Sequence, residues 1–227
     1  MKKMIYDQWI YLREGLFRNT ELKVELVAMT KPVENYGKIC ISETLPAFTA
    51  RASHESKGTI EDDKRLNKTL IELGHTTPLQ AVQFVFYVNG ITKSLQNQWV
   101  RHKIGVGWTF RSTRYIPGSQ NSFIYCNYDY IKSEETVIKL LAIDDMAARQ
   151  AIERFDKKIE LGATKQDSRK IMPVFWNTPC FFYVNARALR HLFSLRLKEA
   201  AEWEIRRLHR TILEIVKKET PSLFHDF

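Results

Sequence analysis

The segment AVQFVFYVNG (81–90) repeats apolar side chains with the two-residue period that is typical of a β-strand. Its large apolar residues on one side are Val82, Phe84, Phe86 and Val88. Such a strand has one very apolar face. A second strand is predicted for CFFYV (180–184), and it leads directly into a long helical region from about 186 to 218.

Further elements are predicted on both sides of this strand. They are a strand over 22–29, helices over 60–73, about 92–102 and 134–161, and a glycine-punctuated loop from 105 to 115. Gly74 and Gly162 would end two of these helices. Because strands and helices alternate irregularly, we predict an α+β fold with a mixed or antiparallel sheet and long helices. The absence of repeats and linkers predicts one domain over 1–227.

The chain is basic, with 35 lysine and arginine residues against 26 acidic ones and a net charge of +9. No acid occurs from Leu73 to Tyr128. Five basic residues lie there: Lys93, Arg101, Lys103, Arg111 and Arg114. This charge indicates an anionic small molecule or a polyanionic partner, or else a solvated basic face.

Other classes of protein are excluded by composition. Asp7 and Arg13 interrupt the N-terminal apolar run, so no secretion signal is predicted, and 73–92 is too polar to span a membrane. Three widely spaced cysteines indicate a reduced, cytoplasmic protein. Six histidines without ligand spacing predict no metal site.

Two basic clusters are placed so that they could converge. In the first (98–115), Gln98, Arg101 and His102 would project from one side of a helix end. Ser112 and Arg114 would point the same way in extended chain. In the second (185–208), one helix face would hold Arg187, Arg190, His191 and Ser194. Guanidinium, amide and hydroxyl groups of this kind hold a phosphate and a polar base edge.

No phosphate-binding glycine loop, nucleophile with its base, or paired-carboxylate site is found in the sequence. All 26 acids are interpreted as helix-surface or capping residues. The spacing therefore favours anion binding without a protein nucleophile, and a cofactor would have to carry the chemistry.

Four segments together resemble the flavin-dependent thymidylate synthases, from about Glu25 to Phe224. They are ARASHESK (50–57), GHTTPLQAVQFVFYVNG (74–90), QWVRHK…STRY (98–115) and DSRKIMP…NARALRHLFSLRLKEAAEWEIR (167–206). The terminal string is long and specific, and all four occur in the family's order.

The resemblance implies an α+β fold, assembled as a homotetramer with active sites at subunit interfaces. It implies a methyltransferase of nucleotide biosynthesis that methylates dUMP at C5 to give dTMP. Methylenetetrahydrofolate would give the carbon, FAD would mediate the hydride and NADPH would reduce the flavin. A protein nucleophile is not implied, in agreement with the absence of one in the sequence.

The resemblance also assigns residues by position. The substrate-binding set is Gln98, Arg101, Ser112, Arg114, Arg169 and Arg196. Within it, Ser112, Arg114 and Arg196 are the catalytic residues. The arginines would neutralise phosphate and polarise the uracil carbonyls, where charge develops. The cofactor-binding set is His75, Thr77, Arg101, His102, Lys103, Ile104, Asn185, Arg187 and His191. Thr77 could also serve a turn, and Asn185 a helix N-cap.

The sequence departs from the family's pattern near the predicted site. Lys103 replaces the second arginine of Arg-His-Arg, and eight residues rather than seven separate it from Ser112. Trp108 and Phe110 enter this loop. Gln80 stands for a glutamate and Glu202 for a glutamine. The departures suggest retained nucleotide binding with altered substrate or flavin handling.

Two alternatives to dUMP methylation stay open at this point. The first is methylation or hydroxymethylation at C5 of another pyrimidine nucleotide by the same scaffold. The second is a nucleic-acid-binding module, which would use Trp99, Trp108, Phe110 and Tyr115 as stacking platforms. Bound flavin would count against this second alternative, and strongly salt-dependent binding of single strands would support it.

Overall fold

The computed structural model describes residues 21–112, 114 and 123–227. Contacts divide the chain into two compact units. Unit 1 comprises Met1–Lys23, Asn89–Gln98 and Phe110–Pro179, and unit 2 comprises Val24–Val88, Trp99–Thr109 and Cys180–Phe227. The α+β class is confirmed by the elements described below. That both units act as one domain stays a prediction.

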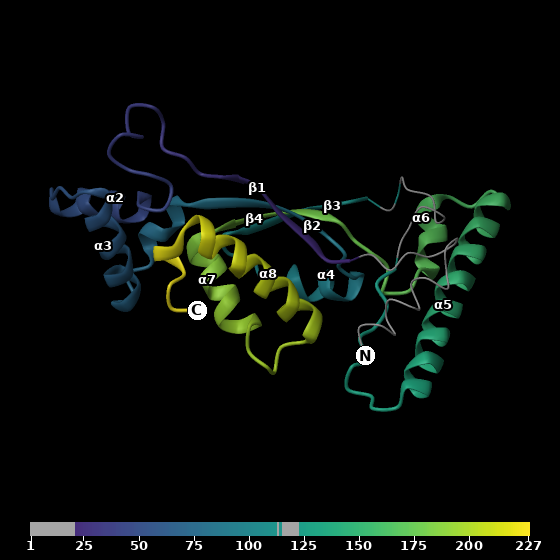
Figure 1. Cartoon of the computed structure of the whole chain (residues 1–227). Coiled ribbons are helices and arrows are strands. Elements are labelled where there is room, and N and C mark those ends of the chain that lie inside the picture. The colour runs from purple at the N-terminus through teal and green to yellow at the C-terminus, as the bar shows by residue number, and fades with distance from the viewer. Residues whose placement is uncertain (1–20, 113, 115–122) are drawn as a thin grey trace. The chain divides into compact units, whose positions relative to one another are not determined.

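A four-stranded sheet has the strand order β1-β2-β4-β3 (Figure 1). The strands are β1 (Lys23–Met29), β2 (Gln83–Asn89), β3 (Val106–Phe110) and β4 (Cys180–Asn185). β2 and β4 pair antiparallel, with Phe84 opposite Val184 and Phe86 opposite Phe182. The three strands predicted from the sequence are therefore confirmed.

The apolar face of β2 and β4 forms the core of unit 2. Phe84, Phe86 and Phe182 are fully buried, and the rings of the last two stack with centroids 6.3 Å apart. Helices α7 (Ala186–Arg196) and α8 (Trp203–Glu219) lie on one side of the sheet (Figure 1). Phe224 joins these layers, because its ring contacts both Phe84 and Phe193 of α7. Each such buried side chain contributes roughly 2 kcal/mol to stability.

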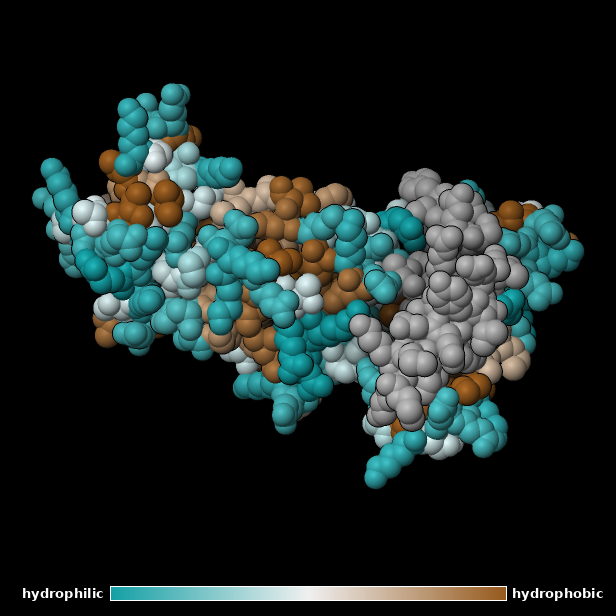
Figure 2. All heavy atoms as spheres, in the orientation of Figure 1, coloured by the Kyte–Doolittle hydropathy of each residue, from teal (hydrophilic) through white to brown (hydrophobic). Residues whose placement is uncertain are grey.

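The other face of the sheet leaves aromatic residues exposed. Tyr87 and Phe181 are cross-strand partners with ring centroids 5.5 Å apart. The hydroxyls of Tyr183 and Thr109 lie 3.0 Å apart. Val27, Phe181 and Tyr183 are all exposed. Figure 2 shows hydrophobic residues at the surface of the part of the molecule that holds the sheet.

Short helices precede β2 in unit 2. They are α2 (Leu45–Arg51), η1 (Ala52–His54), α3 (Ile60–Glu72) and η2 (Thr77–Ala81). A capping box between Thr59 and Asp62 begins α3. Gly74 ends it with φ of 75°, as predicted, and its amide donates to the Ile71 carbonyl.

The long helix predicted from 186 to 218 is wrong, because the chain breaks it between α7 and α8. Glu202 is the N-cap of α8 and accepts a hydrogen bond from the Ile205 amide at 3.2 Å. Arg206 donates from its side chain to the Glu199 carbonyl at 2.6 Å. Side chains therefore hydrogen-bond the backbone amide and carbonyl groups that the break leaves without helical partners. No glycine or proline marks this break in the sequence. The chain ends with η5 (Pro221–Leu223).

The predicted loop from 105 to 115 is also wrong in part, because Val106–Phe110 is strand β3. Trp108 packs inward, with its ring 5.7 Å from Phe182 and 5.8 Å from Trp99. Trp99 is fully buried. Trp99 therefore cannot act as a stacking platform for nucleic-acid bases. Tyr115 lies outside the described residues.

Unit 1 contains α4 (Lys93–Trp99, with Trp99 itself in unit 2), α5 (Glu134–Glu160), α6 (Lys165–Ser168) and η4 (Arg169–Ile171). The helix predicted over 134–161 is confirmed, and Gly162 follows it with φ of 89°. Residues 91–94 are tied to 174–178 by hydrogen bonds. The Lys93 amide donates to the Trp176 carbonyl at 3.0 Å, and the Thr178 amide donates to the Ile91 carbonyl at 2.8 Å.

The interpretation of all acids as surface or capping residues is wrong for several of them. Asp63 is buried and accepts from Arg51 Nε at 2.5 Å. Asp145 is buried in unit 1 and accepts from the Tyr125 hydroxyl at 3.0 Å and from Arg149. These carboxylates are paired, so they act as internal partners of hydrogen-bonding side chains.

Candidate functional site

All nine residues of the predicted cofactor-binding set belong to unit 2. They come from the turn after α3, the turn after α4 and the first half of α7. The predicted substrate-binding set is divided. Arg101 and Arg196 belong to unit 2, whereas the members in unit 1 are Gln98, Ser112, Arg114 and Arg169.

The turn after α4 is fixed against the N-terminus of α7. The Asn185 amide donates to the Gly105 carbonyl at 3.0 Å, and the Asn185 side chain caps α7 by accepting from the Ala188 amide at 2.8 Å. Gly105 has φ of 70°, and a Cβ there would collide with the Asn185 side-chain amide. Glycine is thus required here for both conformation and space.

Arg101, His102, Lys103 and Ile104 lie in this turn rather than on a helix. α4 ends at Trp99, so the prediction that Gln98, Arg101 and His102 share a helix side is wrong. Arg101 and Lys103 are exposed, and Ile104 is 90% exposed. His102 is partly buried, with its amide donating to the Trp99 carbonyl at 3.2 Å.

His102 and Arg196 form the closest contact within the predicted set. Arg196 Nε lies 3.1 Å and Nη2 lies 2.9 Å from His102 Nε2. A guanidinium only donates hydrogen bonds, so Nε2 is the acceptor and the imidazole is neutral with its proton on Nδ1. Burial, and next the charges of Arg196 and His191, lowers the pKa of His102. The contact and the charge thus favour the same neutral state.

His209 of α8 is a buried neighbour that sequence reasoning missed. Its Nδ1 lies 2.7 Å from the Ile205 carbonyl, and its ring packs edge-on against Trp99 and Phe193. Burial lowers its pKa to about 4, and His102 and Arg196 add to the effect. The signal in the sequence was a histidine among Ile205, Leu208 and Ile212, on the apolar face of the helix.

The exposed side of α7 carries Arg187 and His191, as the helical spacing predicted. Arg190 of the same predicted face is committed elsewhere. It forms a bidentate pair with Asp226, at 2.7 and 2.6 Å, and donates to the Leu223 carbonyl at 2.6 Å. Arg190 therefore anchors the C-terminus of the chain.

His75 and Thr77 follow α3, and both are exposed. The His75 amide donates to the Leu70 carbonyl at 2.8 Å. Thr77 begins η2 directly before Pro78. The turn role considered for Thr77 is therefore confirmed, and its side chain is still open to solvent.

Unit 1 places Gln98 at the end of α4 and Arg169 at the start of η4. Ser112 and Arg114 are exposed, and the Arg114 amide donates to Ser112 Oγ at 3.4 Å. Burial, and next the charge of Arg169, lowers the pKa of Lys93 at the start of α4. Lys93 is thus a second cation near Arg169. The predicted binding sets omit Lys93, although it is one of the five basic residues of the acid-free segment.

The cofactor-binding residues fit a flavin dinucleotide by their chemistry. Arg101, Lys103 and Arg187 are exposed cations, and the N-terminus of an 11-residue helix adds backbone dipoles that favour anions. His191 and the side-chain NH₂ group of Asn185 can donate to a polar ring edge. Such donors suit a group with two phosphates and a heteroaromatic ring.

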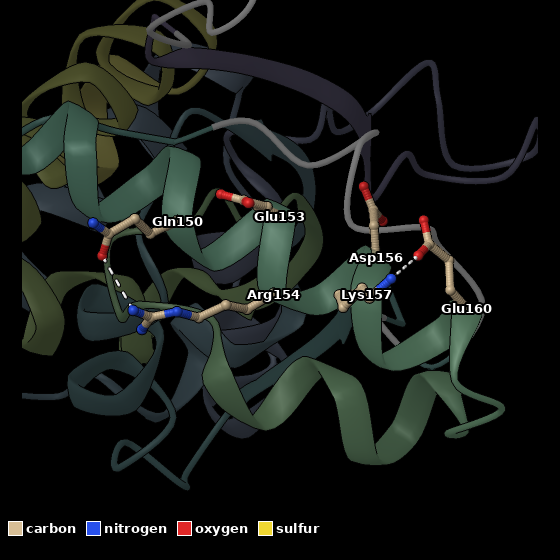
Figure 3. Close-up of a pocket in the computed structure, with 6 residues that line it drawn as sticks. All are labelled: Gln150, Glu153, Arg154, Asp156, Lys157 and Glu160. Carbon is tan, nitrogen blue, oxygen red and sulfur yellow. Dashed lines mark hydrogen bonds and ion pairs between the residues drawn. The ribbon is translucent and has the colours of Figure 1, made fainter.

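A surface hollow on α5 lies apart in sequence from every predicted residue (Figure 3). It is lined by Gln150, Glu153, Arg154, Asp156, Lys157 and Glu160. Lys157 pairs with Glu160 at 2.9 Å. Because one helix supplies all six side chains and charges of both signs, we interpret the hollow as a solvated helix face.

The described part of the chain holds neither a candidate metal site nor a candidate membrane span. No group of three or more histidine, cysteine, aspartate or glutamate side chains there could hold a metal ion. In the same residues, no helix has the length and apolar character needed to cross a membrane.

Comparison with known proteins places the chain in a family. The sequence model of the family "Thymidylate synthase complementing protein" matches residues 25–222. A flavin-dependent thymidylate synthase of Clostridium tetani is 30% identical over 220 residues, which cover 89% of this chain and 85% of the relative. One of Geobacter sulfurreducens is 28% identical over 192 residues, 81% of each chain, and one of Halobacterium salinarum is 24% identical over 94% of each. The resemblance in the sequence motifs is confirmed: this chain belongs to the thymidylate synthase complementing protein family.

Proposed function

We propose that this chain is a flavin-dependent thymidylate synthase that methylates dUMP at C5 to give dTMP. In this proposal FAD is the cofactor, methylenetetrahydrofolate gives the carbon and NADPH is the reductant. The relatives named above are called flavin-dependent thymidylate synthases, which supports a flavin and thymidylate synthesis. The observation that carries the proposal is that all nine predicted cofactor residues fall in unit 2, in two turns and on one helix with its N-cap.

The chain's own residues would bind and polarise. Arg101, Lys103 and Arg187 would hold the flavin phosphates, and the turn at Gly105 would allow a close approach of backbone. Arg196 would direct N–H groups at a uracil carbonyl, where negative charge develops as a hydride adds to the ring. In unit 1, Gln98, Ser112, Arg114 and Arg169 stay proposed nucleotide-binding residues by their positions in the motifs. When bound, the flavin supplies the hydride chemistry that no side chain of this set supplies.

The absorbance spectrum of the purified chain, alone and after addition of FAD, tests the cofactor. We expect flavin bands and a spectral change when dUMP is added. A protein that stays colourless and cannot be loaded with FAD would overturn the proposal. Tight, salt-dependent binding of single strands by that protein would instead support a nucleic-acid module.

The substrate is tested by product analysis with dUMP and other pyrimidine nucleotides. We expect NADPH oxidation that depends on dUMP and yields dTMP. The rebuilt segment at 104–111 is the reason to include the other nucleotides. A C5-hydroxymethyl product, or turnover of another nucleotide alone, would replace dUMP methylation with the related reaction.

We also propose a homotetramer with active sites at subunit interfaces. The exposed aromatic face of the sheet, with Val27, Phe181 and Tyr183, supports burial against another chain. Sedimentation of the purified protein should give four times the chain mass. A stable monomer with full activity would contradict the assembly.

A further inference from the structure

We propose that His102 is a positioning residue that holds the guanidinium of Arg196 in the orientation required for nucleotide binding. The inference rests on the proposed function for the identity of the ligand. The contact itself is independent of that function. It joins a turn and a helix that are 94 residues apart in the sequence and lie in one unit.

The geometry constrains the plane of the guanidinium. Arg196 Nε and Nη2 both converge on His102 Nε2, at 3.1 and 2.9 Å. A guanidinium has five N–H donors, and this contact uses one on Nε and one on Nη2. The contact leaves the N–H groups of Nη1 and the second N–H of Nη2, which together form the end of the guanidinium, unused. That end is the fork that binds a carbonyl or phosphate in bidentate fashion.

The histidine holds the arginine without neutralising it. A carboxylate at the position of His102 would cancel the positive charge, as Asp226 does for Arg190. A neutral imidazole accepts from both nitrogens through the one lone pair of Nε2 and leaves the charge for a ligand. Arg196 is only partly buried, so a ligand can reach it.

The surrounding charges maintain this state. The ionisable groups that act on His102 are Arg196 and His191 from α7, and His102 and Arg196 in turn act on His209 of α8. His209 stays neutral at physiological pH because its burial lowers its pKa to about 4. Of His102 and His209, His102 is therefore the histidine whose protonation would change the charge beside Arg196.

The first test needs no nucleotide. In the full chain labelled with 15N-histidine, NMR should show His102 with its proton on Nδ1 and with a pKa below the ordinary value. In Arg196→Gln the pKa of His102 should rise, because the neighbouring cation is lost. An Nε2–H tautomer, or an unchanged pKa in this variant, would overturn the inference whatever the enzyme does.

The second test measures dUMP dissociation constants at pH 8 by calorimetry. His102→Phe removes the acceptor and should weaken binding about tenfold, the size expected for misplacing one charged hydrogen-bond donor. His102→Gln keeps a side-chain acceptor and should bind within about threefold of the wild type. His225→Gln is the matched control, since the His225 ring lies near the C-terminus with its Nδ1 3.1 Å from the Ser222 carbonyl, and His225 belongs to neither predicted binding set. It should bind dUMP like the wild type.

The pH profile separates positioning from a structural role. Protonated His102 cannot accept from Arg196, so the ratio of wild-type to His102→Gln turnover should fall as pH drops below 7. Titration of dUMP itself cancels in this ratio. A flat ratio, or unweakened dUMP binding in His102→Phe, would contradict the inference. If the NMR results hold but the wild type binds no dUMP, the proposed function fails and the pair loses its assigned ligand.

Discussion

Two arginines of helix α7 have different partners in this protein: Arg190 lies near the middle of the helix and Arg196 is its last residue. Arg190 is paired with the carboxylate of Asp226, donates to the Leu223 carbonyl and lies with its guanidinium carbon 5.0 Å from the centre of the Phe227 ring. Arg196, six residues later, is held by the neutral ring of His102. The first arginine has a counter-ion within the chain, whereas in our proposal the second keeps its charge for a ligand. The partner, rather than the arginine, distinguishes an anchor from a binding group.

The largest effect is expected on catalysis when Arg196 is changed. Arg196→Gln should lower the rate of dTMP formation by about 10²–10³-fold, the typical cost of removing one donor that stabilises developing charge. The melting temperature should change little, because the side chain is partly exposed and joins no carboxylate in the described structure. Steady-state kinetics and thermal unfolding of the same preparations check this. A variant with near wild-type turnover would remove Arg196 from the site.

A smaller effect, on stability, is expected when His209 is protonated. His209 belongs to α8, and its ring packs against Phe193 of α7. Its folded pKa of about 4 lies below the ordinary value of 6.5, so the unfolded chain takes up the proton first as pH falls. The contribution of His209 to the free energy of unfolding is therefore fully present above pH 6.5. It is lost as the pH falls through about 4, by about 3 kcal/mol in total. Urea unfolding at pH 7 and pH 5 measures it.

His209→Leu is the control for this acid sensitivity. It removes the titrating group from an apolar site, so the part of the pH dependence due to His209 should disappear. An equally steep loss of stability in this variant would assign the effect to other groups, such as the buried carboxylates.

The smallest of the three effects is expected when Arg190 is changed. Arg190→Gln should cost about 1–2 kcal/mol, a value reduced because Asp226 is 42% exposed. Arg190 lowers the pKa of Asp226, so its stabilising contribution is present above the carboxyl's unfolded pKa and is lost as pH falls through the folded one. Turnover at a temperature well below unfolding should be unchanged. A large loss of turnover at that temperature would show that Arg190 also takes part in binding or catalysis.

Much of the fold could be predicted from the sequence, because its elements have local signals. The alternation at Phe84 and Phe86 marked β2, and Gly74 and Gly162 marked two helix ends. The break before α8 had no such signal, since Glu202 caps the helix by tertiary geometry that spacing does not reveal. β3 was missed because Gly105 and Gly107 resemble a loop, whereas the packing of Trp108 makes this segment a strand.

The site could be predicted as a set of residues but not as an arrangement. Motif positions identified His102 and Arg196, yet nothing in a sequence separation of 94 residues indicates that their side chains meet. The different partners of Arg190 and Arg196 could not be predicted either, because the partner of Arg190 is Asp226, 36 residues later in the sequence. His209 was missed because a buried histidine on an apolar helix face resembles a core residue, which it also is.

The most direct test is the dUMP dissociation constant of the wild type, Arg196→Gln and Arg190→Gln, measured side by side. We expect binding about ten- to a hundredfold weaker for Arg196→Gln, the range for one charged hydrogen-bonding group, and within about twofold of the wild type for Arg190→Gln. Equal affinities in all three proteins, or equal losses in both variants, would contradict this expectation.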